Sequence, residues 1–126
     1  MLEIKHYECQ EIQEEIFEEF SDPDSIIRLS KENIEQFLSL YSKGNSIVRI
    51  ISAGDDAHET IKEGLKTVDI QNAKAVLLNI ITSKSKALEA TNELSDQYCF
   101  SEDLPFYWAL TLQENKNITL KAFIIR

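Results

Sequence analysis

The chain has 126 residues, of which 43 % are apolar and 28 % are charged, and this is the size and composition of one ordinary globular domain. Its formal net charge of −9 at pH 7 argues against binding to nucleic acid or to anionic lipid, since both carry negative charge. Two cysteines, Cys9 and Cys99, are too few for a disulfide framework. With no signal-peptide pattern and no long apolar stretch, the sequence predicts a cytoplasmic protein without membrane contact.

The first residues predict a short strand followed by an amphipathic helix. The strand is expected over residues 2–7, and the helix is expected to begin near Glu8. Its apolar residues are spaced for one face of a helix, opposite a glutamate-rich face: Ile12, Ile16, Phe17 and Phe20. Pro23 ends the pattern, because proline cannot continue a helix. More often than not, such an acidic face is simply the solvated side of the helix.

A short extended segment over residues 25–29 precedes a second predicted helix. Ser30 is a favourable N-cap, and Asn33 occupies the position that Glu or Gln takes in a capping box. The apolar face of this helix consists of Ile34, Phe37, Leu38 and Tyr41. We expect Gly44 to end the helix in a left-handed conformation.

Residues 46–126 predict the order β-α-β-α-β-β. Strands are expected at residues 47–51, 74–81, 106–112 and 117–125, with helices after Asp56 and after Thr82. The run from Val76 to Ile80 is apolar on both faces except at Asn79, which indicates a central strand that is covered on each side.

The predicted fold class is α+β, with a four-stranded mixed sheet that carries two helices on one face and is preceded by N-terminal helices. Right-handed crossovers place both later helices on the same side of the sheet. We expect a division into an N-terminal helical extension, residues 1–45, and a sheet domain, residues 46–126.

The opposite face of the predicted sheet is too apolar to remain in water. Strand alternation directs Tyr107, Phe123 and Ile125 to this face. Either the N-terminal helix covers these side chains or a second protein does. We expect the chain's own N-terminal helix to be the cover, with a partner as the open alternative.

The central run resembles a strand in the C-terminal domain of the tubulin-like cell-division protein FtsZ. The matching residues are Ala73-Lys74-Ala75-Val76-Leu77-Leu78-Asn79-Ile80. Gly54-Asp55-Asp56-Ala57 resembles the turn before the preceding helix of that family, although the family's arginine is absent. The likeness extends backward, so that residues 1–45 resemble the end of the family's central helix and the following loop.

This resemblance implies a shared fold without shared catalysis. In the family, an asparagine and two aspartates of the loop reach the nucleotide site of the next subunit and position the attacking water. The matching residues here are Arg28, Ser30 and Asn33, none of which is a carboxylate that could act on water. The three scattered glycines cannot form a phosphate-binding loop. We therefore expect the GTPase half of the family to be absent, and we expect no catalytic residue and no cofactor.

The function predicted from the resemblance is a non-catalytic protein-interaction or self-association domain linked to cell division or filament assembly. The expected partner is another protein or a second copy of the chain. The expected interaction surface consists of Arg28, Ser30, Asn33, Tyr107, Phe123 and Ile125.

A small-ligand-binding or enzymatic domain with the same architecture is the alternative function. Its pocket would be lined by Tyr107 and Trp108, with Arg49 or Lys121 as the charged group. His6 and His58 lack the spacing of metal ligands, so no metal site is predicted. His58 is instead expected to be an exposed residue in the first turn of a helix.

Overall fold

A computed structural model describes residues 2–7, 9–20, 25–27, 29–66, 73–97, 104–114 and 117–126. The strands are β1 (Leu2–Tyr7), β2 (Ser25–Ile27), β3 (Ile47–Gly54), β4 (Ala75–Thr82), β5 (Phe106–Leu112) and β6 (Ile118–Ile125). The α-helices are α1 (Cys9–Glu19), α2 (Lys31–Ser39), α3 (Ala57–Lys66) and α4 (Ala87–Gln97), and a 3₁₀ turn, Lys84–Lys86, precedes α4.

All six of these strands belong to one mixed sheet with the order β1-β3-β6-β4-β5-β2. Only the β4·β5 pair is parallel, and the other neighbours are antiparallel. The α+β class is confirmed. The four strands predicted for residues 46–126 form the centre of the sheet, and the N-terminal strands β1 and β2 extend it at its two edges, so the sheet has six strands and not the expected four. β4 lies between β6 and β5, which confirms the central position predicted from its apolar run.

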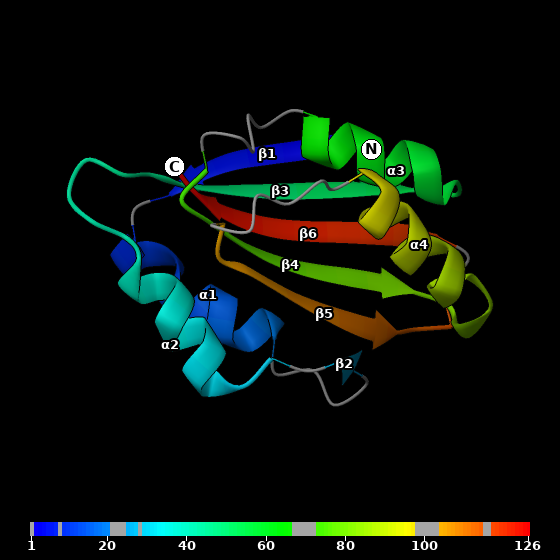
Figure 1. Ribbon diagram of the computed structural model, residues 1–126, viewed down its shortest axis with the longest axis horizontal. Coiled ribbons are helices and arrows are strands. Elements are labelled where there is room, and N and C mark those ends of the chain that lie inside the picture. Colours follow the sequence, from blue (N-terminus) through cyan, green and yellow to red (C-terminus); the bar gives the residue numbers. More distant parts are fainter. Residues whose placement is uncertain are drawn as a thin grey trace.

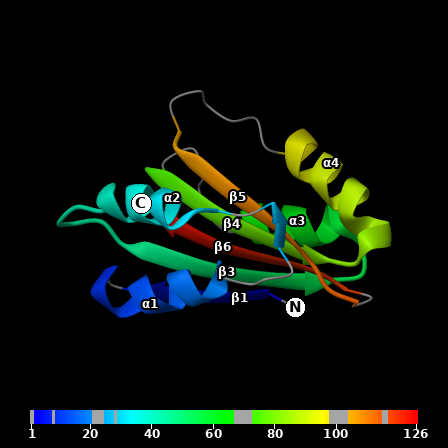
Figure 2. The ribbon, with the colours of Figure 1, turned by 90° about the horizontal axis from the view of Figure 1, so that it is seen from below.

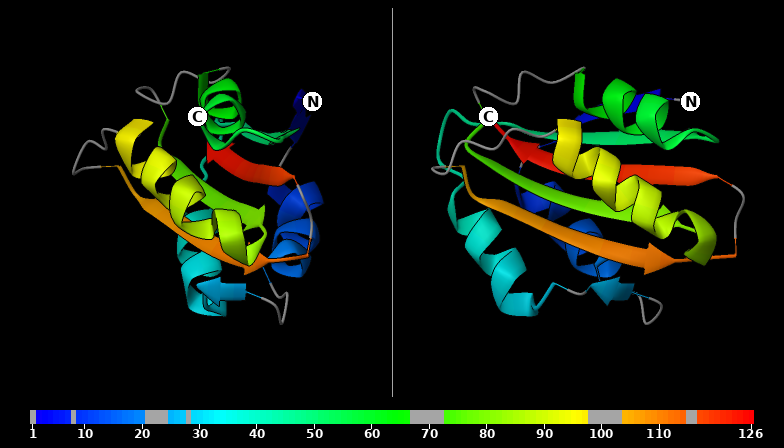
Figure 3. Two further views of the ribbon diagram at one scale, coloured as in Figure 1. Left: turned by 90° about the vertical axis from the view of Figure 1, so that its right-hand side faces the viewer. Right: turned by 45° about the vertical axis from the view of Figure 1, so that its right-hand side comes forward.

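Each face of the sheet carries a pair of helices. The face toward α3 and α4 packs Val48, Ile50, Val76, Leu78, Ile118 and Leu120 against the helices (Figure 1). The face toward α1 and α2 packs Ile47, Ala75, Leu77, Phe123 and Ile125 (Figure 2). In the right-hand view of Figure 3, α4 lies in front of the sheet and α1 behind it. The period-2 assignment of β5 and β6 to the two faces is thus confirmed, as is the placement of both later helices on one side.

The start of α2 is as predicted, but its end is not. Ser30 is the N-cap, and its side chain forms a capping box with Asn33. The helix ends at Ser39 with Leu40 as the C-cap in a right-handed conformation, five residues before the expected glycine. Gly44 does take the left-handed conformation, with φ +96°. It does so in a separate turn in which Asn45 N–H donates to the Ser42 carbonyl, because this turn, and not the helix terminus, needs the glycine.

Close packing of α3 on the sheet predicts that Gly64→Ala destabilises the protein. A Cβ at Gly64 would stand 2.6 Å from Leu120 Cδ2 and 3.1 Å from Ser52 Cβ. Overpacking of this kind costs about 1–3 kcal/mol, which outweighs a gain in helix propensity of up to about 1 kcal/mol. Urea unfolding should therefore show a net loss of up to about 2 kcal/mol.

Lys62→Ala is the matched control, because Lys62 is exposed on the same helix. Its effect should stay within about 0.5 kcal/mol. Equal free energies of unfolding for the Gly64 and Lys62 variants would contradict the close approach of α3.

Candidate functional site

The apolar residues of the expected interaction surface lie beneath the N-terminal helices. Phe123 and Ile125 are buried in the core between the sheet and α1 and α2, and Tyr107 is half-buried beside it. The Phe20 and Phe123 rings are 6.2 Å apart, and Phe37 contacts Tyr107 edge-on at 6.5 Å. The expectation that the chain covers this face itself is confirmed.

Because the N-terminal helices cover this face, two residues of the expected interaction surface are not accessible. Phe123 and Ile125 pack against the chain's own helices, which supply Ile16, Phe20, Ile34 and Phe37. Because both side chains are fully enclosed, they stabilise the fold and do not face a partner. Their direction toward this face and its cover by the chain's own helix were both predicted, and only their assignment to an interaction surface is corrected.

The polar residues of the expected surface lie at the start of α2. Ser30 N–H donates to Asn33 Oδ1 at 3.1 Å, and the Ser30 hydroxyl donates to the same oxygen at 2.8 Å. The Asn33 N–H in turn donates to Ser30 Oγ at 3.1 Å. Ser30 is exposed and Asn33 is half-buried. The two side chains therefore satisfy each other and the helix terminus, and neither is a base that could activate water.

Several residues weighed in the sequence lie outside what the structure describes. Arg28 and Cys99 are not described, nor are the side chains of His6 and Cys9. His58 lies in the first turn of α3 and is exposed, as predicted. Its Nδ1 is 2.9 Å from Glu93 Oε2 on α4. This contact joins the two helices of one layer.

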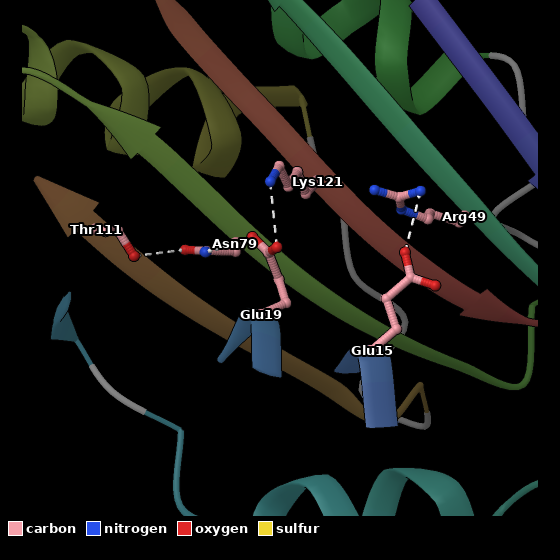
Figure 4. Close-up of polar contacts among 6 residues, drawn as sticks. All are labelled: Glu15, Glu19, Arg49, Asn79, Thr111 and Lys121. Carbon is pink, nitrogen blue, oxygen red and sulfur yellow. Dashed lines mark hydrogen bonds and ion pairs between the residues drawn. The ribbon is translucent and has the colours of Figure 1, made fainter. Parts of the chain in front are cut away.

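A group of polar side chains that sequence reasoning did not bring together lies between α1 and the sheet. We call Glu19, Asn79, Thr111 and Lys121 the polar cluster (Figure 4). Asn79 Nδ2 donates to Glu19 Oε1 at 3.3 Å, and Thr111 Oγ1 donates to Asn79 Oδ1 at 3.1 Å. Lys121 Nζ donates to Glu19 Oε2 at 3.1 Å. One turn earlier on α1, Glu15 pairs with Arg49 at 3.1 Å.

The polar cluster holds α1 in place on the sheet. Asn79 is only 1 % exposed, and a buried amide needs hydrogen-bond partners. Glu19 supplies one of them from α1, and Thr111 supplies another from the neighbouring strand β5. The Thr111 hydroxyl donates to the Asn79 amide oxygen. The arrangement therefore fixes the position of α1 on the sheet.

The geometry does not support the alternative pocket. Trp108 packs on the α3 and α4 side of the sheet, whereas Tyr107 packs on the α1 and α2 side. The two aromatic side chains therefore cannot line one cavity. The cations suggested for it, Arg49 and Lys121, are paired with Glu15 and Glu19 on α1.

Within the described ranges, no three His, Cys, Asp or Glu side chains are grouped so that they could hold a metal ion. Among the helices that the structure describes, none is long and apolar enough to cross a bilayer.

Comparison with solved structures identifies the fold. The empty FtsZ dimer of M. jannaschii matches with a TM-score of 0.64 and 18 % sequence identity, over 91 % of this chain and 36 % of that chain. A tryptophan-to-tyrosine mutant of M. jannaschii FtsZ matches with a TM-score of 0.62 and 18 % identity, over 86 % of this chain and 35 % of that chain. No protein-family model and no curated protein sequence matches.

The resemblance seen in the sequence is thus confirmed as a shared fold. The chain spans little more than a third of the length of the FtsZ chains that it matches. At 18 % identity the likeness concerns the architecture alone.

Proposed function

We propose that this chain, which has the fold of part of FtsZ, is a non-catalytic protein-interaction domain. It pairs with itself or with a filament-forming protein in the cytoplasm, and so acts in filament assembly or cell division. Two features support this proposal. The chain matches little more than a third of an FtsZ chain, and its three scattered glycines cannot form a phosphate-binding loop.

The observation that carries the proposal is the cap at the start of α2. The family's loop brings aspartates to a neighbouring nucleotide. Here the matching residues Ser30 and Asn33 bind each other through three hydrogen bonds. Without a carboxylate at either position, these two residues lack the means to activate water. The segment from Arg28 to Asn33, which ends in the first turn of α2, and a sheet edge are the proposed contact regions.

The test is the effect of the purified chain on the assembly of M. jannaschii FtsZ with GTP, followed by light scattering. The expected result is a dose-dependent change in scattering, with no GTP hydrolysis by the chain alone. Lys31→Glu reverses an exposed charge within the segment from Arg28 to Asn33 and should weaken the effect. Lys84→Glu makes the same change at the exposed start of the 3₁₀ turn and should leave it intact.

Two results would count against this function. GTP hydrolysis by the isolated chain would show that it is an enzyme. Unchanged FtsZ assembly, combined with a chain that is strictly monomeric, would leave the domain without an interaction.

A further inference from the structure

We propose that strand β1 pairs with β1 of a second copy of this chain, around a two-fold axis at Ile4. This pairing is antiparallel and would join the two six-stranded mixed sheets into one continuous sheet. This inference rests on the proposed function, because it names the surface and the register of self-association.

The two edges of the sheet are built differently. β1 pairs with β3 through six consecutive residues without any shift in register. β2, at the other edge, has three residues and a register irregularity between Ser25 and Ile27. Short and irregular edge strands discourage pairing with other chains, whereas long regular ones invite it. Within the described part of the chain no strand pairs with the outer side of β1, and its sequence contains no proline.

The backbone hydrogen bonds of β3 determine which backbone groups of β1 point outward. Ser46 and Arg126 exchange both of their backbone hydrogen bonds. Alternate residues of an antiparallel strand bond to opposite neighbours, so Val48, Ile50 and Ser52 bond to β6. Ile47, Arg49 and Ile51 therefore bond to β1, through their register partners Tyr7, Lys5 and Glu3. The free N–H and C=O groups of β1 are then those of Leu2, Ile4 and His6.

Charge selects one register from the few that these groups allow. A two-fold axis at Ile4 pairs Ile4 with Ile4 of the second copy and Leu2 with His6, so that all three outward residues are bonded. It also places each Glu3 opposite Lys5 of the second copy. A shift of the axis to residue 3 would oppose two glutamates, and a shift to residue 5 would oppose two lysines. Like charges directly opposite each other destabilise a strand pair, and unlike charges stabilise it.

The side chain at the centre of this register is apolar and accessible. Ile4 is 42 % exposed, although its neighbour across the ladder, Ile50, is buried. The two-fold pairing would bury the two Ile4 side chains against each other. β1 also carries one Glu and one Lys, so this edge has no net charge even though the whole chain carries −9. The acidic character of the protein therefore does not repel a second copy at this edge.

The test is a charge exchange in β1 with the dimer dissociation constant measured by sedimentation equilibrium. Glu3→Lys and Lys5→Glu each convert two attractive cross-strand pairs into two repulsive ones. Each single variant should weaken the dimer by about tenfold or more. The double variant Glu3→Lys/Lys5→Glu restores both attractions and should return the constant to within about threefold of the wild-type value.

Ile4→Pro is an independent variant. It removes an N–H that points outward, so the β1·β3 ladder keeps its bonds while the central bonds of the dimer are lost. The variant should be monomeric with a folded circular-dichroism spectrum. Leu88→Ala, at an apolar side chain on α4 that is 73 % exposed, should leave the dimer unchanged. If Ile4→Pro unfolds the protein, the charge-exchange variants still test the pairing of β1 with β1.

The outcomes separate this inference from the proposed function. A dimer dissociation constant that the single variants leave unchanged would overturn the β1 pairing. So would a double variant that dimerises no more tightly than the single variants. Either result would leave the chain an interaction domain. A wild-type chain that is monomeric but alters FtsZ assembly would also overturn the pairing and leave the proposed function standing.

Discussion

Replacing Phe37 with alanine should lower the free energy of unfolding by about 3–5 kcal/mol, which is the usual cost of truncating a fully buried phenylalanine. Phe37 is the anchor of α2: its side chain is completely buried, and its ring meets the face of the sheet at Tyr107. The loss should appear in urea unfolding. The wild-type and variant transitions should have the same slope if the unfolded state is unchanged.

Leu40→Ala is the matched control for this variant. Leu40 caps the C-terminal end of the same helix and is 37 % exposed, so its truncation should cost less than about 1 kcal/mol. If the two variants were equally stable, α2 would not pack on the sheet. The Phe123 face would then need another cover.

Asn79→Asp should destabilise the protein by about 3 kcal/mol at pH 7, the order of magnitude for an uncompensated buried charge. The substitution keeps the shape of the side chain but replaces the amide that donates to Glu19 with a second carboxylate at the same place. Lys121 already pairs with Glu19, so it compensates the new charge only in part. Chemical denaturation at pH 7 measures the loss directly.

The pH dependence of this variant has a definite sign. The neighbouring Glu19 carboxylate and burial both raise the pKa of the introduced aspartate above its value in the unfolded chain. The folded state then binds more protons than the unfolded state. The destabilisation relative to wild type should therefore shrink as the pH falls toward 5 and grow as the pH rises.

Asn45→Asp is the control, because it makes the same change at a half-buried turn residue beside Lys74. There the side-chain oxygen only accepts hydrogen bonds, from Ser42 and Lys74, and a carboxylate can do the same. This variant should lie within about 0.5 kcal/mol of wild type. A cost for Asn79→Asp that matched this control at every pH would show that Asn79 does not face Glu19.

Much of the fold follows from local patterns in the sequence. Alternation along β5 and β6 predicted which side chains face each layer, because a strand has a period of two residues. The capping box at Ser30 was predicted because it depends on residues only three positions apart. The cover of the second face followed from the amphipathic stripe that ends at Phe20.

The contacts of the polar cluster could not be predicted from such local patterns. Asn79 was visible as the one polar residue in an apolar strand, and this signal marks a buried hydrogen-bonding group. Its partner Glu19 is one of many glutamates along α1. Which of them lies over Asn79 depends on the angle at which the helix crosses the sheet, and sequence periodicity does not give that angle. The pairing of β1 with β3 and of β2 with β5 likewise depends on tertiary contacts and not on strand propensity.

Sedimentation velocity of the chain, alone and mixed with assembling M. jannaschii FtsZ, tests the central claim most directly. If the chain is an interaction domain, the chain itself should sediment faster than its 14.5 kDa monomer in at least one of the two samples. If the chain pairs through β1, the faster species already appears in the chain alone and disappears in Ile4→Pro. If the chain sedimented only as a monomer in both samples, at concentrations up to the highest that remain soluble, this result would contradict the account.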